Sequence, residues 1–534
     1  MSKENQGRES GKGLDRRQFL KVTGAAMGAM GVSGLFPGAN LFAATPRVGG
    51  TFRPATVGYT VHRTFDPALV SLIGESQILW TMFNSLVRFD ANMNIIPDLA
   101  QSWNTPDETT YRFKLYPRIK FHDGTDCTAE DVVFSLDRVR DPATGSPNQG
   151  KLSEVNSIKA IDNQTVEIKT RGPFAPLMAY LCNARTGTQI VSKKAVERLG
   201  ADYGKKPVGT GPFKMVDWKP GEKVEFARHS QYFMKGLPYL DAVTEVLIGE
   251  ESTATNAILS GDADLISTVL FSDVQSLEKT KGIKVVKQPG LNSRFVMLNC
   301  QTKPFDDPAV RQAFSYSFDR KQLIDAVIYG EGVAVQGIIP PAIKWAYHPS
   351  LKSQTFNPEK ARELLKRSKY KKPDLQVTIL TFGTGWWKRF AEIVAAQSQE
   401  VLEIPTKVEV IEAGAIATRY QQSDFQCGVW GWLGLVEPDE YAYENFHSKG
   451  SKNYVKYSNS RVDGLLEKAR TTLNRNQRAQ LYHQAEDIIG EEAPYAFCFT
   501  NLVHNAMKDY VMDFIPVPFS AFGQQFDRVW LSKS

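Results

Sequence analysis

Between residues 375 and 430 the sequence alternates strand-like and helix-like segments, and this alternation restricts the fold more than any other feature. Strand patterns are predicted at 375–382, 406–411 and 425–430, with helical patterns at 388–402 and 416–422. Strands joined by helical crossovers pair in parallel with right-handed connections. We therefore predict an α/β fold, with mixed sheets and flanking helices, in which ligands bind at the carboxyl ends of the strands.

Two of these strand ends are rich in tryptophan and glycine. The segment 381–387 carries Trp386 and Trp387, and the segment 430–434 carries Trp430 and Trp432. Any single tryptophan could equally well belong to the core. Four of them at one sheet edge indicate a binding site.

Other patterns predict antiparallel strands and capped helices. Segments 109–115 and 165–169 alternate with period two, as half-buried strands do. Thr128 and Asp131 form a capping box for a helix through about residue 138. A helix is predicted at 76–89, and Asp307 followed by proline predicts another helix start.

Length and composition exclude several classes of protein. The chain has 534 residues, which predicts two or three domains, and its composition is globular. A net charge of +6 is small for this length and does not indicate a nucleic-acid partner. The five cysteines contain no CxxC pair, so we interpret them as free core residues.

The first 44 residues are interpreted as a signal peptide. The string RRQFLK, from Arg16 to Lys21, resembles the twin-arginine export signal. A glycine-broken apolar stretch and a small-residue cleavage zone ending at Ala44 follow it. A membrane anchor is the alternative, but a spanning helix needs roughly 20 apolar residues. We expect a soluble mature chain in the periplasm, without direct membrane insertion.

A search for catalytic motifs finds none that is specific. The seven histidines form no HxxxH or HxH pair, and no GxSxG or Walker sequence is present. The glycine-rich segment 208–212 enters a strand through proline, which does not favour a phosphate loop. A carboxylate pair assembled in space is invisible in sequence, so an exported hydrolase remains the alternative function.

Several strings together resemble one known family. They are NSLVRFD at 84–90, IPDLAQSW at 96–103, FHDGT at 121–125, TAEDV at 128–132, GTGPF at 209–213 and PFDDPAVRQA at 304–313. This set is similar to the periplasmic solute-binding proteins, family 5, of the dipeptide, oligopeptide and nickel ABC importers. The resemblance covers essentially the whole mature chain.

The resemblance implies the bilobal periplasmic-binding-protein fold, class II, with an extra subdomain in lobe one. Lobe one would span 45–290 plus 500–534, with the subdomain near 96–207, and lobe two would span 291–499. The implied function is non-enzymatic capture of a small organic or peptide-like solute for delivery to ABC permease transmembrane subunits. We expect a monomer with no cofactor, no metal and no nucleic-acid partner.

The sequence departs from the family pattern at two positions where dipeptide-type members carry charged residues that pair with the ends of the peptide. Where dipeptide-type members carry an aspartate after Trp-x-Gly, this chain has Leu435, followed by Glu437. The family's arginine position aligns near Thr381. These losses argue against a zwitterionic dipeptide and favour an amphipathic or cationic solute held by cation–π contacts.

In lobe one, Tyr59 and His62 are the pocket candidates, and His62 is also weighed as a nickel or haem ligand. The full set of predicted ligand contacts is Tyr59, His62, Thr381, Trp386, Trp387, Trp432, Leu435 and Glu437. For Glu437, a turn-capping role is an equal alternative.

Overall fold

The structure is a computed structural model that describes residues 45–182, 185–351, 354–372, 375–383, 385–434, 436–518 and 526–533. The predicted signal peptide, residues 1–44, lies outside the described residues.

A thirteen-stranded mixed sheet is the largest element of the described chain. Its main path runs, in spatial order, through β17 (Thr406–Ile411), β16 (Val377–Phe382), β18 (Cys427–Leu433), β14 (Asn292–Leu298), β19 (Tyr495–Lys508), β12 (Leu265–Ile266), β2 (Pro54–Val57), β11 (Ala242–Ile248), β10 (Lys223–Arg228) and β9 (Phe213–Lys219). Three strands lie off this path: β1 (Thr51–Phe52), β13 (Ile283–Pro289) and β15 (Gly332–Ala334).

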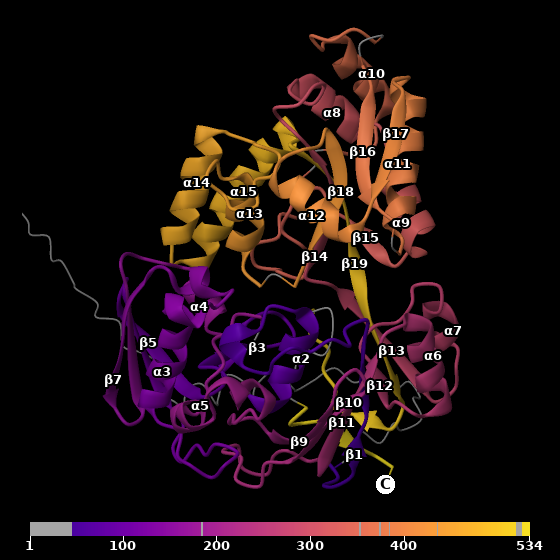
Figure 1. The fold of residues 1–534 in the computed structure, drawn as a ribbon. Helices are drawn as coiled ribbons and strands as arrows, with labels where there is room; N and C mark the ends of the chain where they lie inside the picture. Colours follow the sequence, from indigo (N-terminus) through magenta and orange to yellow (C-terminus); the bar gives the residue numbers. More distant parts are fainter. Residues whose placement is uncertain are drawn as a thin grey trace, which may run out of the picture. The chain divides into compact units, whose positions relative to one another are not determined.

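The long strand β19 connects the two parts of this sheet. Its first half pairs with β14 and β15, and its second half pairs with β12 and β13. Figure 1 shows β19 running from the group that contains β14, β16 and β18 towards β12 and β13. A fourteen-residue strand can serve both groups because it extends roughly 3.3 Å per residue.

The predicted alternation of strands and helices between 375 and 430 is confirmed. Strands β16 and β17 are parallel, and so are β16 and β18, with α11 (Trp387–Leu402) and α12 (Ala413–Gln421) as crossovers. The prediction was wrong about the end of the last strand. β18 continues through Leu433 because residues 427–433 all pair with β14, so Trp430 and Trp432 lie in a strand and not in a loop.

The predicted antiparallel strands form a separate four-stranded sheet. It contains β5 (Ala100–Asp107), β6 (Thr110–Leu115), β8 (Thr165–Thr170) and β7 (Val155–Asp162) in that order. Helix α3 (Ala129–Arg140) packs against this sheet, and the predicted capping box is present, with the Thr128 amide donating to Asp131 at 2.9 Å.

The predicted helix over 76–89 is only partly correct. The observed helix α2 covers Ile73–Met82, and β3 (Val87–Phe89) then pairs with β4 (Ile95–Pro97). Buried Asp98 explains the break because it accepts hydrogen bonds from the Asn84 side chain at 2.6 Å and the Ser85 amide at 2.9 Å. These bonds hold residues 84 and 85 out of the helix.

The other helices surround the sheets (Figure 1). They are α4 (Leu177–Tyr180), α5 (Lys193–Leu199), α6 (Glu251–Ser260), α7 (Val274–Glu278), α8 (Pro308–Tyr316), α9 (Arg320–Ile328), α10 (Pro358–Lys366), α13 (Pro438–Phe446), α14 (Ser460–Thr471) and α15 (Arg475–Glu492). The predicted cap of α8 is confirmed, since the Asp307 carboxylate accepts from the Ala309 amide at 2.9 Å. A last pair of strands, β20 (Val511–Met512) and β21 (Trp530–Leu531), lies near the C-terminus.

Buried apolar side chains form distinct clusters. One cluster contains residues from 296 to 499, a second contains residues from 68 to 190, and a third contains residues from 55 to 506. The largest cluster links parts of the whole described chain.

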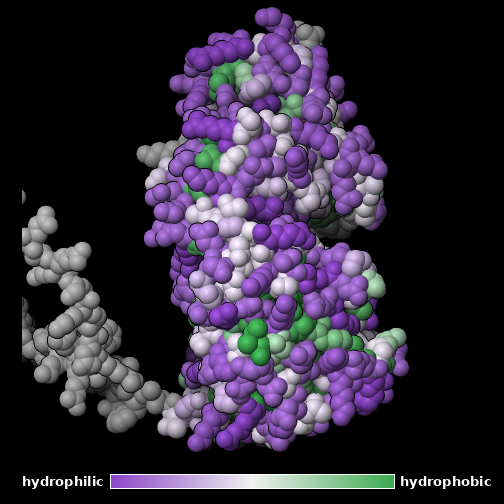
Figure 2. Space-filling view, turned by 90° about the vertical axis from the view of Figure 1, so that its left-hand side faces the viewer, coloured by the Kyte–Doolittle hydropathy of each residue, from purple (hydrophilic) through white to green (hydrophobic). Residues whose placement is uncertain are grey.

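All five cysteines are free, and four of them are buried, as predicted. No helix among the described residues is long and apolar enough to cross a membrane. The face shown in Figure 2 is largely hydrophilic, with hydrophobic residues in small groups.

The glycine-rich segment 208–212 packs tightly against the end of α2. The Gly211 amide donates to the Met82 carbonyl oxygen at 2.8 Å, and a Cβ on Gly211 would lie 2.3 Å from the Met82 carbonyl carbon. Ring nitrogens of His122 and His229 each lie 3.1 Å from the Gly211 carbonyl oxygen. The glycines therefore allow close packing of two backbone segments.

We expect Gly211→Ala to lower the free energy of unfolding by about 1–3 kcal/mol, because the added methyl group forces the two backbones apart. Urea unfolding followed by fluorescence measures the change. Gly464→Ala is the matched control: Gly464 lies within α14 with open space around its Cβ position, so this change should stabilise by about 0.5–1 kcal/mol. Equal stability of Gly211→Ala and wild type would contradict the packing role.

Candidate functional site

A buried arginine lies beside the aromatic side chains that the sequence singled out. Arg294, on β14, is only 7% exposed. Its guanidinium carbon lies 5.6 Å from the ring centroid of Trp386 and 5.4 Å from that of Trp387. Burial lowers the pKa of Arg294 to about 10, which still leaves the side chain charged at neutral pH.

The glycine opposite Arg294 makes room for its side chain. Arg294 pairs with Gly431 across strands β14 and β18, and a Cβ on Gly431 would lie 2.6 Å from Nη1 of Arg294. Nη1 donates to the carbonyl oxygens of Trp432 at 3.1 Å and Ser293 at 3.5 Å. The guanidinium therefore lies directly against the β18 backbone.

Trp386 and Trp387 form one stacked pair at the start of α11. Their ring centroids are 4.4 Å apart at an interplanar angle of 20°, and Trp386 also lies 6.0 Å from Phe499 on β19. The expectation that these rings hold an amphipathic or cationic solute stays a prediction. The cation beside them belongs to the chain itself, Arg294, and a second cation would be repelled by it.

Along β18, Trp430 and Trp432 alternate with Gly431. Their side chains therefore lie on the face of the strand opposite to the one that packs against Arg294. The Trp432 indole nitrogen donates to Asn445 at 2.7 Å, and the Lys452 ammonium lies 4.7 Å from the Trp432 ring. The structure thus joins Trp432 to α13 and the segment after it, and the Trp432 ring is linked to the Trp386–Trp387 pair only through the rings of Trp430 and Phe382.

The Tyr59 side chain lies within electrostatic reach of Arg294. Burial and the negative charge of Glu251 raise the pKa of Tyr59, while the positive charges of Arg294 and Arg185 lower it. The loop that carries Tyr59 packs directly on α2, where a Cβ on Gly74 would lie 2.6 Å from the Tyr59 Cβ. The chain therefore brings residues 59, 185 and 294, which are far apart in sequence, into one electrostatic environment.

His62 is buried with its ring 5.7 Å from Phe65, and burial lowers its pKa, which favours the neutral form. Neither ring nitrogen has a hydrogen-bond partner among the described residues. Within the same described ranges, no group of three or more histidine, cysteine, aspartate or glutamate side chains could hold a metal ion. His62 thus stays a predicted solute contact.

Two further predicted contacts have different outcomes. Thr381, on β16, is fully buried, and its hydroxyl lies 3.5 Å from the Phe382 carbonyl oxygen. The adjacent Phe382 ring extends the aromatic group, 5.0 Å from Trp387 and 6.2 Å from Trp430. Leu435 lies outside the described residues.

Glu437 makes a buried ion pair and caps a helix. Its carboxylate accepts from Arg478 Nη2 at 2.5 Å, and both side chains are 4% exposed. It also accepts from the Asp439 amide at 3.4 Å, at the start of α13. The capping alternative is therefore observed, together with an ion pair that the sequence did not reveal.

The neighbouring carboxylates of α13 are also paired with basic residues. Asp439 lies 3.2 Å from Arg470, and burial raises the pKa of Asp439 to about 7. The Glu440 carboxylate accepts a hydrogen bond from the Lys151 ammonium at 2.5 Å, and Lys151 lies in the segment just before β7. Helix α13 thus joins distant parts of the chain through compensated charges.

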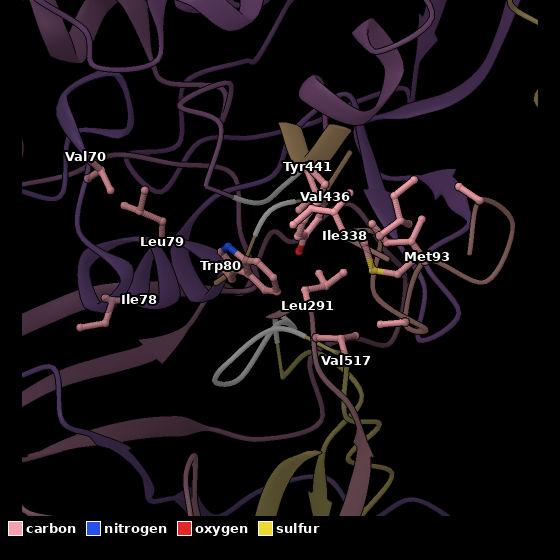
Figure 3. Packing of buried hydrophobic residues seen from close by; sticks show 14 of the residues in the cluster. Val70, Ile78, Leu79, Trp80, Met93, Leu291, Ile338, Val436, Tyr441 and Val517 are labelled. Atoms are coloured by element: carbon pink, nitrogen blue, oxygen red, sulfur yellow. The ribbon is translucent and has the colours of Figure 1, made fainter. Parts of the chain in front are cut away.

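A cavity of about 370 Å³ lies beside the ion pair of Glu437 with Arg478. Its lining combines apolar side chains with Glu437, Arg475 and Arg478, and Arg475 donates to Asn94 and to the Met93 carbonyl at 3.3 Å each. Met93 and Val436, two lining residues, pack in the same cluster as Trp80, Leu291 and Tyr441. Figure 3 shows Trp80 extending from α2 towards Leu291, with Val436 and Tyr441 nearby.

The sequence-based prediction missed Arg294. A signal was available, since Arg294 is the one charged residue in the apolar strand 292–298. A lone arginine in an otherwise buried strand needs a partner. The residues that surround it come from distant segments, so the sequence alone could not identify that partner.

The comparisons with known proteins identify the family. A model of the bacterial extracellular solute-binding proteins, family 5 Middle, matches residues 94–454. The chain belongs to this family. As a member, it is the substrate-binding subunit of an ABC importer, with the α/β fold of the periplasmic binding proteins.

Individual relatives agree with this assignment. The glutathione-binding protein GsiB of Shigella flexneri serotype 5b is 29% identical over 450 residues, covering 81% of this chain and 86% of GsiB. The solved structure of DppA from Helicobacter pylori with the peptide STSA is 28% identical, with a TM-score of 0.76 over 91% of this chain and 99% of DppA. AgaA of A. tumefaciens R10, solved with agropinic acid, is 25% identical, with a TM-score of 0.74 over 91% of this chain and 99% of AgaA.

We expect Glu437→Gln to destabilise the protein by about 3–5 kcal/mol, because Arg478 is then left buried without its counter-charge. Thermal and urea unfolding measure the loss. Glu409→Gln, which breaks the more exposed pair of Glu409 with Arg419, is the control and should cost less than about 1 kcal/mol. A stable Glu437→Gln variant that has lost only solute binding would instead make Glu437 a solute contact.

Proposed function

We propose that this protein captures an organic or peptide-like solute between two lobes and presents the closed form to its permease. The observation that carries this proposal is the packing of buried Arg294 against the Trp386–Trp387 pair, with Tyr59 acting electrostatically on the same guanidinium. These residues come from early and late segments of the chain. A solute that contacts both sets is bound completely only when the segments approach each other.

The proposed lobes are 45–290 with 500–534, including a subdomain near 96–207, and 291–499. Two of the apolar clusters fit these boundaries, since one is confined to residues 296–499 and another to residues 68–190, while the largest cluster contains side chains from both proposed lobes. The crossing segments would be 289–294 and 499–503, where β14 and β19 pair at Arg294 and Phe499.

Closure follows from a difference in affinity. The solute stabilises the closed state only by as much as it binds that state more tightly than the open one. Two crossing strands permit such a hinge motion because a few residues absorb the backbone rotation. The permease then recognises a surface that exists only after closure.

We infer that no catalytic step accompanies capture. The carboxylates Glu437, Asp439 and Glu440 are engaged with Arg478, Arg470 and Lys151, respectively, so they serve as structural charges. The relatives that match most of the chain are described as binding proteins. An exported hydrolase has no comparable support.

The relatives suggest the kind of solute to test. Their descriptions name glutathione, the peptide STSA and agropinic acid, which are polar organic molecules of modest size. Stacked tryptophans beside Arg294 suit a solute with both an apolar and a polar part.

We expect at least one solute from a library containing these three compounds to raise the melting temperature and reduce the radius of gyration. Binding at 100 times Kd adds about 2.7 kcal/mol of stability. Differential scanning fluorimetry and small-angle X-ray scattering measure the two effects.

The matched variants are Trp387→Ala, which should lose the response, and Trp103→Ala. Trp103 lies on β5 of the four-stranded sheet and packs against a different apolar cluster, so its substitution should preserve the response. If no compound in a broad library produces either stabilisation or compaction, solute capture is the wrong function.

We also propose export to the periplasm through the twin-arginine pathway, carried by the RRQFLK string at 16–21. Substituting both Arg16 and Arg17 by lysine should leave the uncleaved precursor in the cytoplasm. Fractionation and mass spectrometry of the N-terminus measure location and cleavage.

The control is Arg8→Lys, outside the motif, which should leave export unchanged. Undiminished export of the double-lysine variant would contradict this route. Cleavage after Ala44 is the expected processing site.

A further inference from the structure

We propose that a basic pocket beside α10 adsorbs the protein to a bilayer that contains anionic phospholipids, without insertion of any segment. The pocket has a volume of about 450 Å³ and lies between the end of α10 and the end of α11. We call it the α10 pocket, and its basic lining residues are Arg362, Lys366, Lys371 and Lys372. None of these residues belongs to the candidate solute site, so the proposal goes beyond solute capture.

The sequence concentrates positive charge around this pocket. Of the thirteen residues from 360 to 372, seven are lysine or arginine and one is glutamate. The resulting excess of six positive charges equals the net charge of the whole chain, which is +6. The rest of the chain is therefore neutral in sum, and this one segment accounts for the net positive charge.

Three of the four basic residues have no carboxylate partner among the described residues. The Lys372 ammonium pairs with Glu403, whereas Arg362 Nε donates to a backbone carbonyl oxygen at 3.1 Å. Lys366 and Lys371 have no carboxylate within 4.0 Å in the described part of the chain. All four basic residues are exposed, so their charges are available to a partner outside the protein.

Stabilisation of α10 accounts for only part of this cluster. Basic side chains in the last turn of a helix complement the partial negative charge of its C-terminus. Lys366 is the last residue of α10, but Arg362 lies one turn earlier, and Lys371 and Lys372 follow the helix. The charges away from the helix end therefore need another explanation.

The floor of the α10 pocket is apolar. Leu365, Leu375 and Leu402 line it, and each of them is at most 5% exposed. Tyr370 also lines the pocket, and its hydroxyl donates to Asp306 at 2.8 Å. A cationic rim above an apolar floor fits a molecule that is anionic at one end and apolar at the other, as an anionic phospholipid is. Inorganic phosphate would use only the rim.

The type of basic residue favours an extended anionic surface over one fixed acidic group. Three of the four residues are lysines, which carry a compact charge on a flexible stem, whereas arginine suits bidentate recognition. Each basic residue near an anionic leaflet contributes separately to adsorption. Figure 1 shows α10 at the upper end of the group that contains β16, β17 and α11, and such an end can meet a flat surface. Adsorption would keep this subunit of an ABC importer on the bilayer in which its permease lies.

The test measures adsorption to vesicles by co-sedimentation. The probes are vesicles with about 30% phosphatidylglycerol in phosphatidylcholine, and vesicles of phosphatidylcholine alone. We expect the protein to sediment with the first and not with the second. Raising sodium chloride from about 0.05 M to about 0.5 M should release it, because salt screens exposed charges. Inorganic phosphate at equal ionic strength should release no more protein than sodium chloride does.

Two triple variants assign adsorption to the α10 pocket, and both share the N-terminus of the wild type. The first carries Lys366→Gln, Lys371→Gln and Lys372→Gln. It should lower the partition coefficient roughly 100-fold, since each charge contributes about fivefold. The matched control removes the same charge from exposed residues on and after α5, with Lys194→Gln, Arg198→Gln and Lys206→Gln. It should change the partition coefficient by less than about threefold, because screening limits each charge to its own surroundings.

Each outcome supports or overturns the proposal. Adsorption of the pocket variant that equals that of the wild type, or an equal loss in both variants, would overturn the role of the α10 pocket. A wild type that does not sediment with the phosphatidylglycerol vesicles at low salt would overturn adsorption itself, and this comparison needs no variant to fold. Binding to soluble poly-glutamate in place of those vesicles would make an acidic polypeptide the partner. No solute enters these measurements, so solute capture stands or fails independently.

Discussion

The pairing of β14 with β19 is the interaction on which the rest of the structure depends. The Asn292 side chain donates to the Asn501 carbonyl at 3.0 Å, and its oxygen accepts from the Asn501 amide at 2.9 Å. Gly290 lies so close to this pair of hydrogen bonds that a Cβ on Gly290 would fall 2.1 Å from the side-chain nitrogen Nδ2 of Asn292. Because β14 and β19 are neighbours in the main sheet, this bond pair fixes how its two parts are connected. Arg294 lies two residues along the same strand, so its position is set by the same pairing.

Charge is handled in two different ways within this protein. Around α13, every buried carboxylate has a basic partner, and the pairs join segments as distant as Lys151 and Glu440. Such networks add geometric definition and are costly to break at one partner. Beside the Trp386–Trp387 pair, by contrast, one cation is left with aromatic faces and backbone carbonyls only. The first arrangement balances charge with charge, and the second leaves a buried cation whose described contacts are aromatic rings and backbone carbonyls.

Much of the fold could be predicted from local sequence patterns. The alternation at 375–430, the Thr128 capping box and the Asp307 cap were correct because each depends on neighbouring residues. The helix predicted at 76–89 was too long because Asp98, outside the segment, binds residues 84 and 85. The site was harder to predict for the same reason. Whether Glu437 is free or paired depends on Arg478, forty-one residues away, and no periodicity carries that information.

Gly431 has a consequence for how the surroundings of Arg294 can change. The arginine fits only because the residue across the strand pair has no side chain. Any larger residue at 431 would displace the guanidinium, even with Arg294 still present. The two positions are therefore coupled by packing, and a substitution at Gly431 would disturb Arg294 without changing the arginine itself. The two residues lie on neighbouring strands but 137 residues apart in the sequence, so only the fold shows that they depend on each other.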